Sequence, residues 1–548
     1  MASLRLSSIS HCVLKENSHV PQKAAPSSIF VTRKNADMHC FAAPGVRNYT
    51  IPYPAENISP CEQLKPTHFS DNDHGLRIVE FFKGKSLLIT GATGFFGKAL
   101  IEKILRVVPD VGKIYMLINA KTNEVASDRL KGEIIGTDLF KCLRDTYGPS
   151  FDDVILRKLV PVAGNVSESD LGLSPDIAEM IAGEINLIVN SAANTTFDER
   201  YDAAFEINTR GPSYLLTFAK RCPNLKLFTH MSTAYVNGYK RGTINENALN
   251  LMNGSTERLV EQEMKMIQAL NLASDEKELA TNMRELGLNR AKLHGLQDTY
   301  SFTKAMGEMQ LNKLRGETPV VIIRPSIIES SFKEPYPGWI EGIRMLDPIV
   351  VNYGKGKFSG FIGDPDVAVD VVPVDMVVNG TLAAIAKHGA SQKRDLSVYH
   401  IASSVANPFI LQDLAEIIYE YYRNDPHIAA DGSSIFVQKF ELFNSVDDFG
   451  KKLGASQNNQ VAALRRAEFI RRKSAEKARY FANIYEPYAF FTGRFDNSNT
   501  QSLWQTMSEK EKREFGFDVG IINWRDYITT VHIPGLRKHA LKGRGMNE

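Results

Sequence analysis

Short apolar runs alternate along the chain with longer stretches in which apolar residues recur at helical spacing. The runs lie at residues 87–90, 113–118, 159–163, 187–190, 226–231, 320–323 and 395–403. Runs of this length are typical of buried strands, and the segments between them are long enough for helices. Strands that alternate with helices favour a parallel sheet with helices on both faces. The pattern therefore predicts an α/β fold with a doubly wound parallel sheet.

The character of the chain changes after the last of these runs. Residues 410–423 have the periodicity of an amphipathic helix, and residues 465–482 that of a basic helix. We therefore expect a nucleotide-binding domain at 75–405 and a smaller, mainly helical C-terminal domain at 406–548. A charged insertion with helical periodicity, residues 246–297, is either a solvated helical pair or a lid.

The N-terminal residues differ from the rest of the chain. Residues 1–45 are rich in serine and basic residues, poor in acids, and hold no continuous apolar run. This composition is typical of an organelle transit peptide, of chloroplast rather than mitochondrial type because arginine is sparse. The alternative is a disordered tail without a targeting role. Residues 46–74 contain several prolines and are expected to form a linker.

The composition is that of a globular protein. Of 548 residues, 43% are hydrophobic and 23% charged, and the net charge of +2 gives no overall field that would favour nucleic acid. The 5 cysteines have no metal-like or redox-like spacing, so we expect a reducing compartment and no metal site. No apolar stretch approaches the ~18 residues of a membrane span. We expect a soluble protein with at most peripheral membrane contact.

The segment Leu87–Gly97 reads L-L-I-T-G-A-T-G-F-F-G and joins a predicted strand to a predicted helix that begins near Lys98. Gly91 would permit a sharp turn, Gly94 would let backbone N–H groups approach a pyrophosphate, and Gly97 would let the helix pack closely on the strand. A strand, a glycine turn and a helix in this order open a Rossmann-like dinucleotide-binding unit.

A second pattern, Y-S-F-T-K, places Tyr300 and Lys304 four residues apart, so on a helix they would share one face. A lysine ammonium beside a phenol favours the phenolate, and we expect the pKa of Tyr300 to be lowered from about 10, which would suit a proton donor. Ser232 and Thr233 directly follow the run at 226–231. One of these hydroxyls could hydrogen-bond a substrate oxygen beside Tyr300; the alternative is ordinary turn capping.

The motifs T-G-A-T-G-F-F-G, N-S-A-A, S-T-A-Y-V-N-G, Y-S-F-T-K and I-R-P-S follow the order of the extended short-chain dehydrogenase/reductases, which the chain resembles. Further segments are similar to fatty acyl reductases, also called male-sterility-type proteins: A-A-N-T-T-F-D-E-R-Y (192–201), I-N-T-R-G-P (207–212), E-P-Y-P-G-W-I-E-G (334–342) and Y-G-K-G (353–356). F-D-N-S-N-T, F-G-F-D-V and W-R-D-Y near the end resemble that family's terminal domain. The plant members with a transit-like extension are the most similar, which implies a location in the plastid stroma.

This resemblance implies two successive reductions by NADPH of a long-chain acyl thioester, carried on coenzyme A or acyl carrier protein, to a primary alcohol through an aldehyde. It implies catalysis by Thr233 (Ser232 second), Tyr300 and Lys304, of which Lys304 also binds the nicotinamide ribose. Asn208 and Arg210 are further candidates. Cofactor contacts are implied for Tyr300 and Lys304 and for Thr90, Gly91, Thr93, Gly94, Phe95, Phe96, Gly97, Asn119, Lys121, Asn165, Val166, Ser191, Ala192, Ala193, Arg324, Pro325 and Ser326.

Two positions depart from the family pattern. A basic residue that meets the 2′-phosphate of NADPH usually follows the second strand, but here that residue is Asn119, and Lys121 is the cation that could take over. Leu296 stands where tryptophan commonly follows the residue equivalent to Gly295, which could alter the pocket or weaken activity.

Basic residues gather on the predicted helix at 465–479, where they could receive an acidic carrier protein or coenzyme A phosphates, or form a solvated face. They are Arg465, Arg466, Arg471, Arg472, Lys473, Lys477 and Arg479. We expect an alcohol-forming reductase. The alternatives are an enzyme that stops at the aldehyde or acts on another carbonyl, and a weakly active cofactor-binding partner in a lipid-synthesis assembly; the intact Thr233, Tyr300 and Lys304 argue against the last.

Overall fold

The computed structural model describes residues 75–249, 256–391, 393–429, 431–455 and 465–543, which belong to one compact unit. The expected transit peptide (1–45) and linker (46–74) lie outside the described residues. The expected domain boundary after residue 405 stays a prediction.

A seven-stranded parallel sheet forms the centre of the fold, as the alternating pattern predicted. In spatial order its strands are β3 (Leu159–Ala163), β2 (Ile114–Ile118), β1 (Leu87–Thr90), β4 (Leu187–Asn190), β5 (Leu227–Met231), β7 (Val320–Pro325) and β11 (Leu396–Ile401). The strand order reverses between β1 and β4, and ligands of such sheets bind beyond the carboxyl ends of the strands at this reversal.

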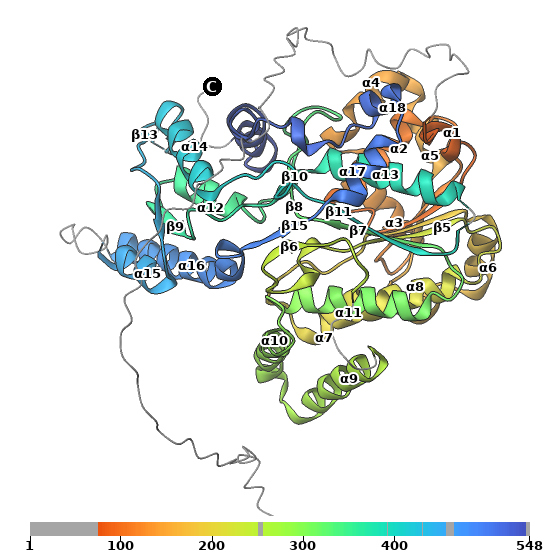
Figure 1. Cartoon of the computed structure of the whole chain (residues 1–548), viewed down its shortest axis with the longest axis horizontal. Coiled ribbons are helices and arrows are strands. Elements are labelled where there is room, and N and C mark those ends of the chain that lie inside the picture. The colour runs from red at the N-terminus through yellow and green to blue at the C-terminus, as the bar shows by residue number, and fades with distance from the viewer. Residues whose placement is uncertain (1–74, 250–255, 392, 430, 456–464, 544–548) are drawn as a thin grey trace, which may run out of the picture. The chain divides into compact units, whose positions relative to one another are not determined.

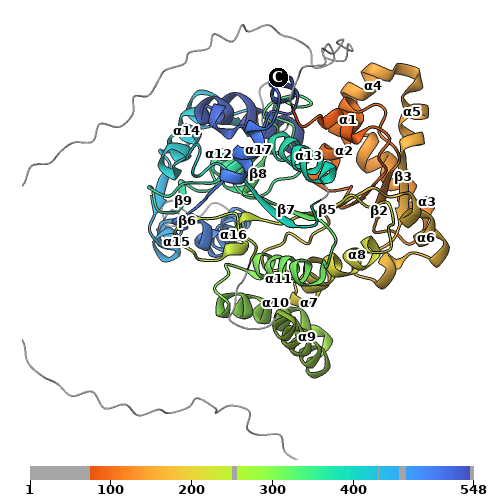
Figure 2. The same ribbon diagram turned by 45° about the vertical axis from the view of Figure 1, so that its right-hand side comes forward.

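Helices cover both faces of the sheet (Figures 1 and 2). Leu87 and Ile89 of β1 pack in the cluster that includes residues of α2 (Phe95–Val107) and α13 (Val374–Ala390). Leu88 points the other way, into a cluster with α6 (Pro175–Glu184) and α8 (Gly211–Ala219). Successive side chains of a strand face opposite sides, so the almost continuous apolar runs of the sequence are explained by burial on both faces.

The charged insertion forms two helices, α9 (Thr256–Ala273) and α10 (Glu276–Leu293), which pack on α11 (Thr299–Leu314). Their apolar residues share a separate cluster with Tyr201 and Phe302, and the buried carboxylate of Glu263 in α9 pairs with Arg290 of α10 inside the pair. The pair is thus built on the helix that carries Tyr300.

The C-terminal region is mainly helical, with α14 (Leu411–Asn424), α15 (Val446–Ala455), α16 (Arg465–Ala489), α17 (Ser498–Gln505) and the short η9 (Tyr527–His532). It also contributes two short strands that pair in parallel with strands of the preceding region. β14 (Glu441–Phe443) pairs with β9 (Gly360–Ile362), and β15 (Gly493–Phe495) pairs with β6 (Gly242–Ile244), which follows the loop after β5. Within the described residues, no helix is both long and apolar enough to cross a bilayer.

The remaining elements connect these parts. They include α1 (Ile78–Phe82), α3 (Asn123–Arg129), α4 (Lys141–Tyr147), α5 (Phe151–Lys158), α7 (Tyr201–Phe205), β8 (Ile327–Glu329), α12 (Asp347–Gly354), β10 (Val371–Pro373) and α18 (Glu509–Glu514).

Candidate active site

The turn after β1 has the close packing that its glycines predicted. Gly91 has a φ of 70°, and a Cβ there would lie 2.6 Å from the backbone of Ser191 and Ala192. A Cβ on Gly97 would lie 2.3 Å from the carbonyl oxygen of Gly91, so α2 approaches the turn more closely than any side chain allows. Gly94 begins α2 without a side-chain cap, which leaves the first amides of the helix available to a phosphate.

Hydrogen bonds hold the ends of β1 and β4 together beside this turn. The hydroxyl of Thr90 donates to Oδ1 of Asn190 at 2.7 Å, and the hydroxyl of Ser191 donates to the carbonyl of Thr90 at 2.7 Å. The amide of Ala192 donates to the Thr90 hydroxyl at 3.1 Å. The structure thus brings Thr90, Gly91, Ser191 and Ala192 to one point at the reversal of strand order.

The catalytic candidates meet between the end of β5 and the first turn of α11. The Thr233 hydroxyl hydrogen-bonds the phenol of Tyr300, and it also accepts the amide of Tyr235 at 3.4 Å. Nζ of Lys304 donates to the carbonyl of Met231, the last residue of β5, at 2.6 Å. Ser232 is buried, and its Oγ has no hydrogen-bond partner among the described residues. Turn capping by Thr233 and contact with Tyr300 therefore occur together.

The pKa of Tyr300 is raised rather than lowered, so the expectation from the Tyr–Lys spacing was wrong for this geometry. Burial disfavours the phenolate, the carboxylate of Asp298 adds to that effect, and the hydrogen bond from Thr233 opposes it. The Lys304 ammonium bonds a carbonyl instead of the phenol. Burial lowers the pKa of Lys304 to about 8, which the charge of Glu308 partly opposes.

Other predicted residues lie in varied settings. Phe95 stacks on Trp339 with ring centroids 5.0 Å apart, which brings the 334–342 motif beside the glycine turn. Asn208 is buried and bonds the backbone of Asn194 and the hydroxyl of Thr303, so it joins that loop to α11. Arg210, in the same short helix, pairs with Glu206 and bonds the hydroxyl of Tyr214.

The ends of β7 and β3 hold the remaining cofactor candidates. Ser326 follows β7, and its buried Oγ has no hydrogen-bond partner among the described residues. Arg324 is fully buried, and its guanidinium bonds the carboxylate of Glu308 at 2.6 Å. We therefore leave Arg324 out of the proposed cofactor contacts, because its charge is already used inside the fold. Asn165 accepts the amide of Ser167 in the loop after β3.

Sequence reasoning missed Arg129, the last residue of α3. Its Nη1 donates to the carbonyl of Asn119 at 2.9 Å, and its Nη2 donates to the Thr93 hydroxyl at 3.4 Å. Glu133 pairs with the same guanidinium. This cation thus lies between the end of β2 and the glycine turn, where Asn119 lacks a charge. The signal in the sequence is a basic residue at the end of the helix that follows the second strand.

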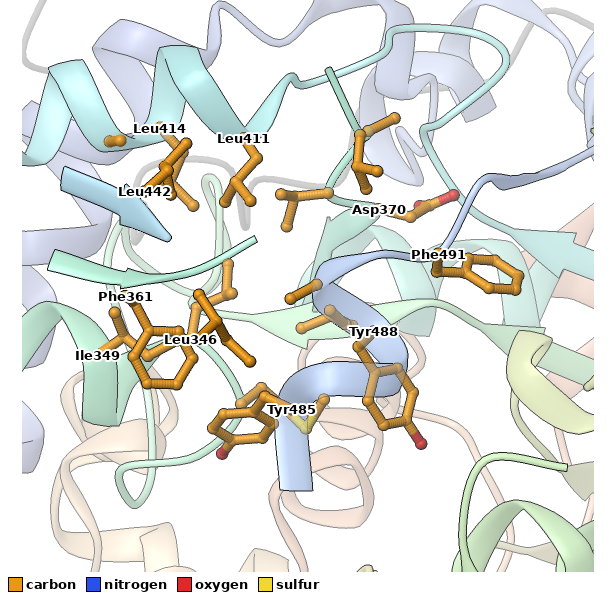
Figure 3. A pocket seen from close by; sticks show the side chains of 18 of the residues that line it. Leu346, Ile349, Phe361, Asp370, Leu411, Leu414, Leu442, Tyr485, Tyr488 and Phe491 are labelled. Atoms are coloured by element: carbon orange, nitrogen blue, oxygen red, sulfur yellow. The ribbon is translucent and has the colours of Figure 1, made fainter. Parts of the chain in front are cut away.

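The structure also holds an apolar cavity of about 830 Å³, its mouth included (Figure 3). Its walls come from the C-terminal region and from the segment between β7 and β10. Tyr235, two residues after Thr233, lines it, and so do Leu346, Ile349, Phe361, Leu411, Leu414, Leu442, Tyr485, Tyr488 and Phe491. Asp370 is the charged residue in this lining.

Aromatic rings lie between this cavity and Tyr300. The rings of Tyr488 and Phe197 stack with centroids 5.2 Å apart, and the ring of Phe197 lies 6.1 Å from that of Tyr300. Tyr235 meets Tyr488 edge to face at 5.0 Å. Tyr300 itself is not in the lining of the cavity, and the rings of Phe197 and Tyr488 lie between the two. Nothing in the spacing of the sequence predicted which C-terminal residues would line it.

Comparisons with known proteins identify one family. Two family models described as "Male sterility protein" match residues 89–381 and 460–543. "Fatty acyl-CoA reductase 2, chloroplastic" of Arabidopsis thaliana is 52% identical over 495 residues, which cover 86% of this chain and 80% of that protein. "Alcohol-forming fatty acyl-CoA reductase" of Simmondsia chinensis is 38% identical, with 85% of this chain and 99% of that protein covered.

Solved structures share the fold at lower identity. The terminal R domain from the myxalamid PKS-NRPS biosynthetic pathway has a TM-score of 0.55 and 16% identity, covering 83% of this chain and 91% of that one. The reductase domain of a nonribosomal peptide synthetase from Mycobacterium tuberculosis has a TM-score of 0.51 and 20% identity, covering 86% and 96%.

Proposed function

The chain belongs to the family of male sterility proteins that includes the fatty acyl-CoA reductases, and from that premise we propose that it reduces a long-chain fatty acyl thioester to a primary alcohol, through an aldehyde, with NADPH. One observation carries the proposal. Thr233, Tyr300 and Lys304 converge at the carboxyl end of the sheet that also holds the glycine turn, and Phe197 and Tyr488 connect Tyr300 to an apolar cavity.

The side chains of the site suit carbonyl reduction. A bound nicotinamide supplies the hydride in each of the two reductions. Thr233 and Tyr300 hydrogen-bond the carbonyl oxygen, so that the negative charge that develops there is stabilised. In the first reduction the resulting hemithioacetal collapses to the aldehyde and releases the thiol. In the second, Tyr300 gives its proton to the alkoxide, and Lys304 holds the ribose hydroxyls.

The residues around the glycine turn suit a dinucleotide, and Arg129 favours NADPH. The crowding at Gly91 and Gly97 leaves no room for side chains, and the uncapped start of α2 suits a pyrophosphate. The guanidinium of Arg129 is held by Glu133, Asn119 and Thr93, and one N–H of its Nη1 is left to donate to a 2′-phosphate. Arg129 therefore replaces the missing cation at position 119 in this proposal.

The cavity suits the acyl chain. Its lining is almost wholly apolar and includes Tyr235, two residues after Thr233. A hydrocarbon tail buried there would keep the thioester carbonyl near Tyr300, and each buried methylene contributes about 0.8 kcal/mol.

The acyl carrier is coenzyme A or acyl carrier protein, and we propose that the enzyme acts in the plastid stroma. The side chains of Arg465, Arg466 and Arg471 lie outside the described residues. Arg472 and Lys473 pair with Glu476, which weakens the case for a docking patch. The serine-rich N-terminus and the relative named chloroplastic support the location.

Turnover of palmitoyl or stearoyl thioesters tests the proposal. The full chain, incubated with NADPH and with the CoA or carrier-protein thioester, is expected to give the alcohol. Accumulation of aldehyde would support the aldehyde-forming alternative. Cofactor binding without turnover would support the weakly active partner.

A further inference from the structure

Three buried side chains of ligand type converge away from the proposed catalytic cluster. Glu329 ends β8, Asp347 begins α12, and His532 ends η9. One donor atom from each lies within 4.8 Å of the others. Nε2 of His532 is 3.2 Å from Oδ1 of Asp347 and 3.8 Å from Oε2 of Glu329.

Two carboxylate oxygens of this cluster have no hydrogen-bond partner in the part of the chain that the structure describes. They are Oε1 of Glu329 and Oδ1 of Asp347, on residues only 2% and 1% exposed. An unsatisfied buried acceptor costs about 1–3 kcal/mol, and more when it is charged. A cation between the two carboxylates would supply the missing partner of both oxygens.

The imidazole of His532 is held with one nitrogen toward the carboxylates. Its Nδ1 lies 3.1 Å from Oγ of Ser330, and the Tyr527 hydroxyl donates to the carbonyl of Ser330 at 2.7 Å. A hydrogen bond at Nδ1 fixes the ring and leaves Nε2 as the ligand atom, and metal-binding histidines are usually held in this way.

We propose that Glu329, Asp347 and His532 bind a divalent first-row transition cation such as Zn²⁺ or Mn²⁺. Two carboxylates and a neutral imidazole carry a charge that such an ion neutralises. The imidazole favours these ions over Mg²⁺ or Ca²⁺, which prefer oxygen ligands alone. The spacing of the sequence predicted no metal site, because the three ligands come from distant segments.

The ion would fasten the C-terminal η9 to β8 and α12. Leu346, next to Asp347, lines the apolar cavity, and the charges of Asp347 and Glu329 reach the cavity residue Tyr485. The ion would therefore stabilise one wall of the cavity without touching Tyr300. Binding of a metal to the folded state alone raises the stability of that state.

Metal content and melting temperature of the full chain test this proposal. After purification with added ZnCl₂ or MnCl₂ and extensive dialysis, we expect about one ion per chain by elemental analysis. Chelator-stripped protein should regain about 2 °C or more in Tm when either salt is returned. E329Q should lose both effects. The control E246Q changes another buried carboxyl, which bonds the amides of His400 and Asn499, and should keep both.

E329Q removes one of two like charges, so stripped E329Q should melt no lower than stripped wild type, which shows that the variant folds. Wild-type protein that holds less than about 0.1 ion per chain and gains no Tm from either salt would overturn the proposal. In that case the two carboxyl groups share a proton and His532 completes a hydrogen-bonded triad. Equal metal binding by E329Q and wild type would overturn it as well.

Discussion

Tyr488 of α16 donates a hydrogen bond to the carboxylate of Asp298, the residue that caps α11. Burial raises the pKa of Asp298 to about 6, and the hydrogen bonds from Ser301 and Tyr488 partly oppose that rise. Tyr488 also lines the apolar cavity, while α11 carries Tyr300. One phenol thus joins the wall of the cavity to the start of the helix that holds the proposed proton donor.

Replacing Tyr488 with phenylalanine is therefore expected to change catalysis as well as stability. Without this donor the pKa of Asp298 rises further, and the inflection that it contributes to the pH profile of kcat moves above about 6. We expect kcat to fall about tenfold, equivalent to ~1.4 kcal/mol. Tyr485→Phe changes another tyrosine of the same cavity and should leave the inflection in place. An unchanged profile in Tyr488→Phe would reduce Tyr488 to a packing residue.

Tyr300→Phe is expected to remove the proton donor and keep the fold. Turnover should fall by about 10²–10⁴, the usual contribution of general acid catalysis, while NADPH affinity measured by fluorescence titration stays near that of wild type. A rate close to wild type would disprove the assignment of the acid.

The two hydroxyls after β5 can be separated by isosteric changes. Thr233 bonds Tyr300, whereas Oγ of Ser232 has no partner among the described residues. We expect Thr233→Val to reduce kcat about 10- to 100-fold and Ser232→Ala to have a smaller effect. The reverse order, measured in steady-state assays, would make Ser232 the hydroxyl that contacts the substrate.

Arg129→Gln is expected to impair the use of NADPH in particular. Loss of a charge-assisted contact to the 2′-phosphate should raise the KM for NADPH about tenfold or more, with little change in the KM for NADH. Lys121→Gln, which changes an exposed neighbour, is the matched control and should leave both values unchanged. If Lys121→Gln shows the NADPH defect instead, the position after the second strand is compensated by Lys121, as the sequence first suggested.

Cofactor affinity should weaken at alkaline pH. The pKa of Lys304 is lowered to about 8, so the ammonium is present below that pH and is lost above it. We expect the Kd for NADPH to be constant below about pH 8 and to rise by up to tenfold per pH unit above it. Lys304→Arg keeps the charge throughout this range, so its affinity, though weaker overall, should not change with pH. A wild-type Kd that is flat to pH 9.5 would exclude this role for the ammonium.

A larger side chain in the lining of the cavity should reduce the chain length of the alcohol product. Leu414→Trp places a larger ring in the lining at a cost of about 1–3 kcal/mol in stability. In a competition assay with mixed thioesters, we expect a shift toward shorter alcohols by gas chromatography. Leu272→Trp, on the exposed surface of α9, should leave the product profile unchanged. An unaltered profile in Leu414→Trp would mean that the acyl chain lies elsewhere.

The parts of the fold that depend on local pattern were predictable. The predicted ranges of β1, β3 and β4 coincide with the strands of the structure, because a strand buried on both faces is marked by its own residues. The rule that the carboxyl ends of parallel strands share one edge predicted the place of Thr233, whereas its meeting with Tyr300 and Lys304 of α11 was expected from the family resemblance. The spacing after the second strand did not reveal Arg129, which reaches the carbonyl of Asn119 from the end of α3.

Features that depend on distant pairing were not predictable from a single sequence. β14 and β15 are three residues long and exist because β9 and β6 lie beside them. The pKa of Tyr300 depends on Asp298 and on burial, neither of which spacing reveals. The lining of the cavity was not predictable for a similar reason. Its residues come from distant segments, and the periodicity of the sequence does not determine how these segments pack together.

The pairing of β15 with β6 limits how such enzymes can be recombined. β6 begins four residues beyond Gly238, which ends the loop of Ser232 and Thr233, and Phe495 of β15 packs its ring 5.1 Å from that of Tyr235 in the same loop. If the C-terminal region is replaced by that of a relative with a different product, the strand and the ring that pack against the loop of Ser232 and Thr233 are replaced with it. Chimeras joined at residue 405 should therefore differ from the recipient enzyme in turnover rate as well as in the chain length of the product. A hybrid that changes chain-length selectivity alone would have to keep residues 242–244 and 493–495 from the same parent.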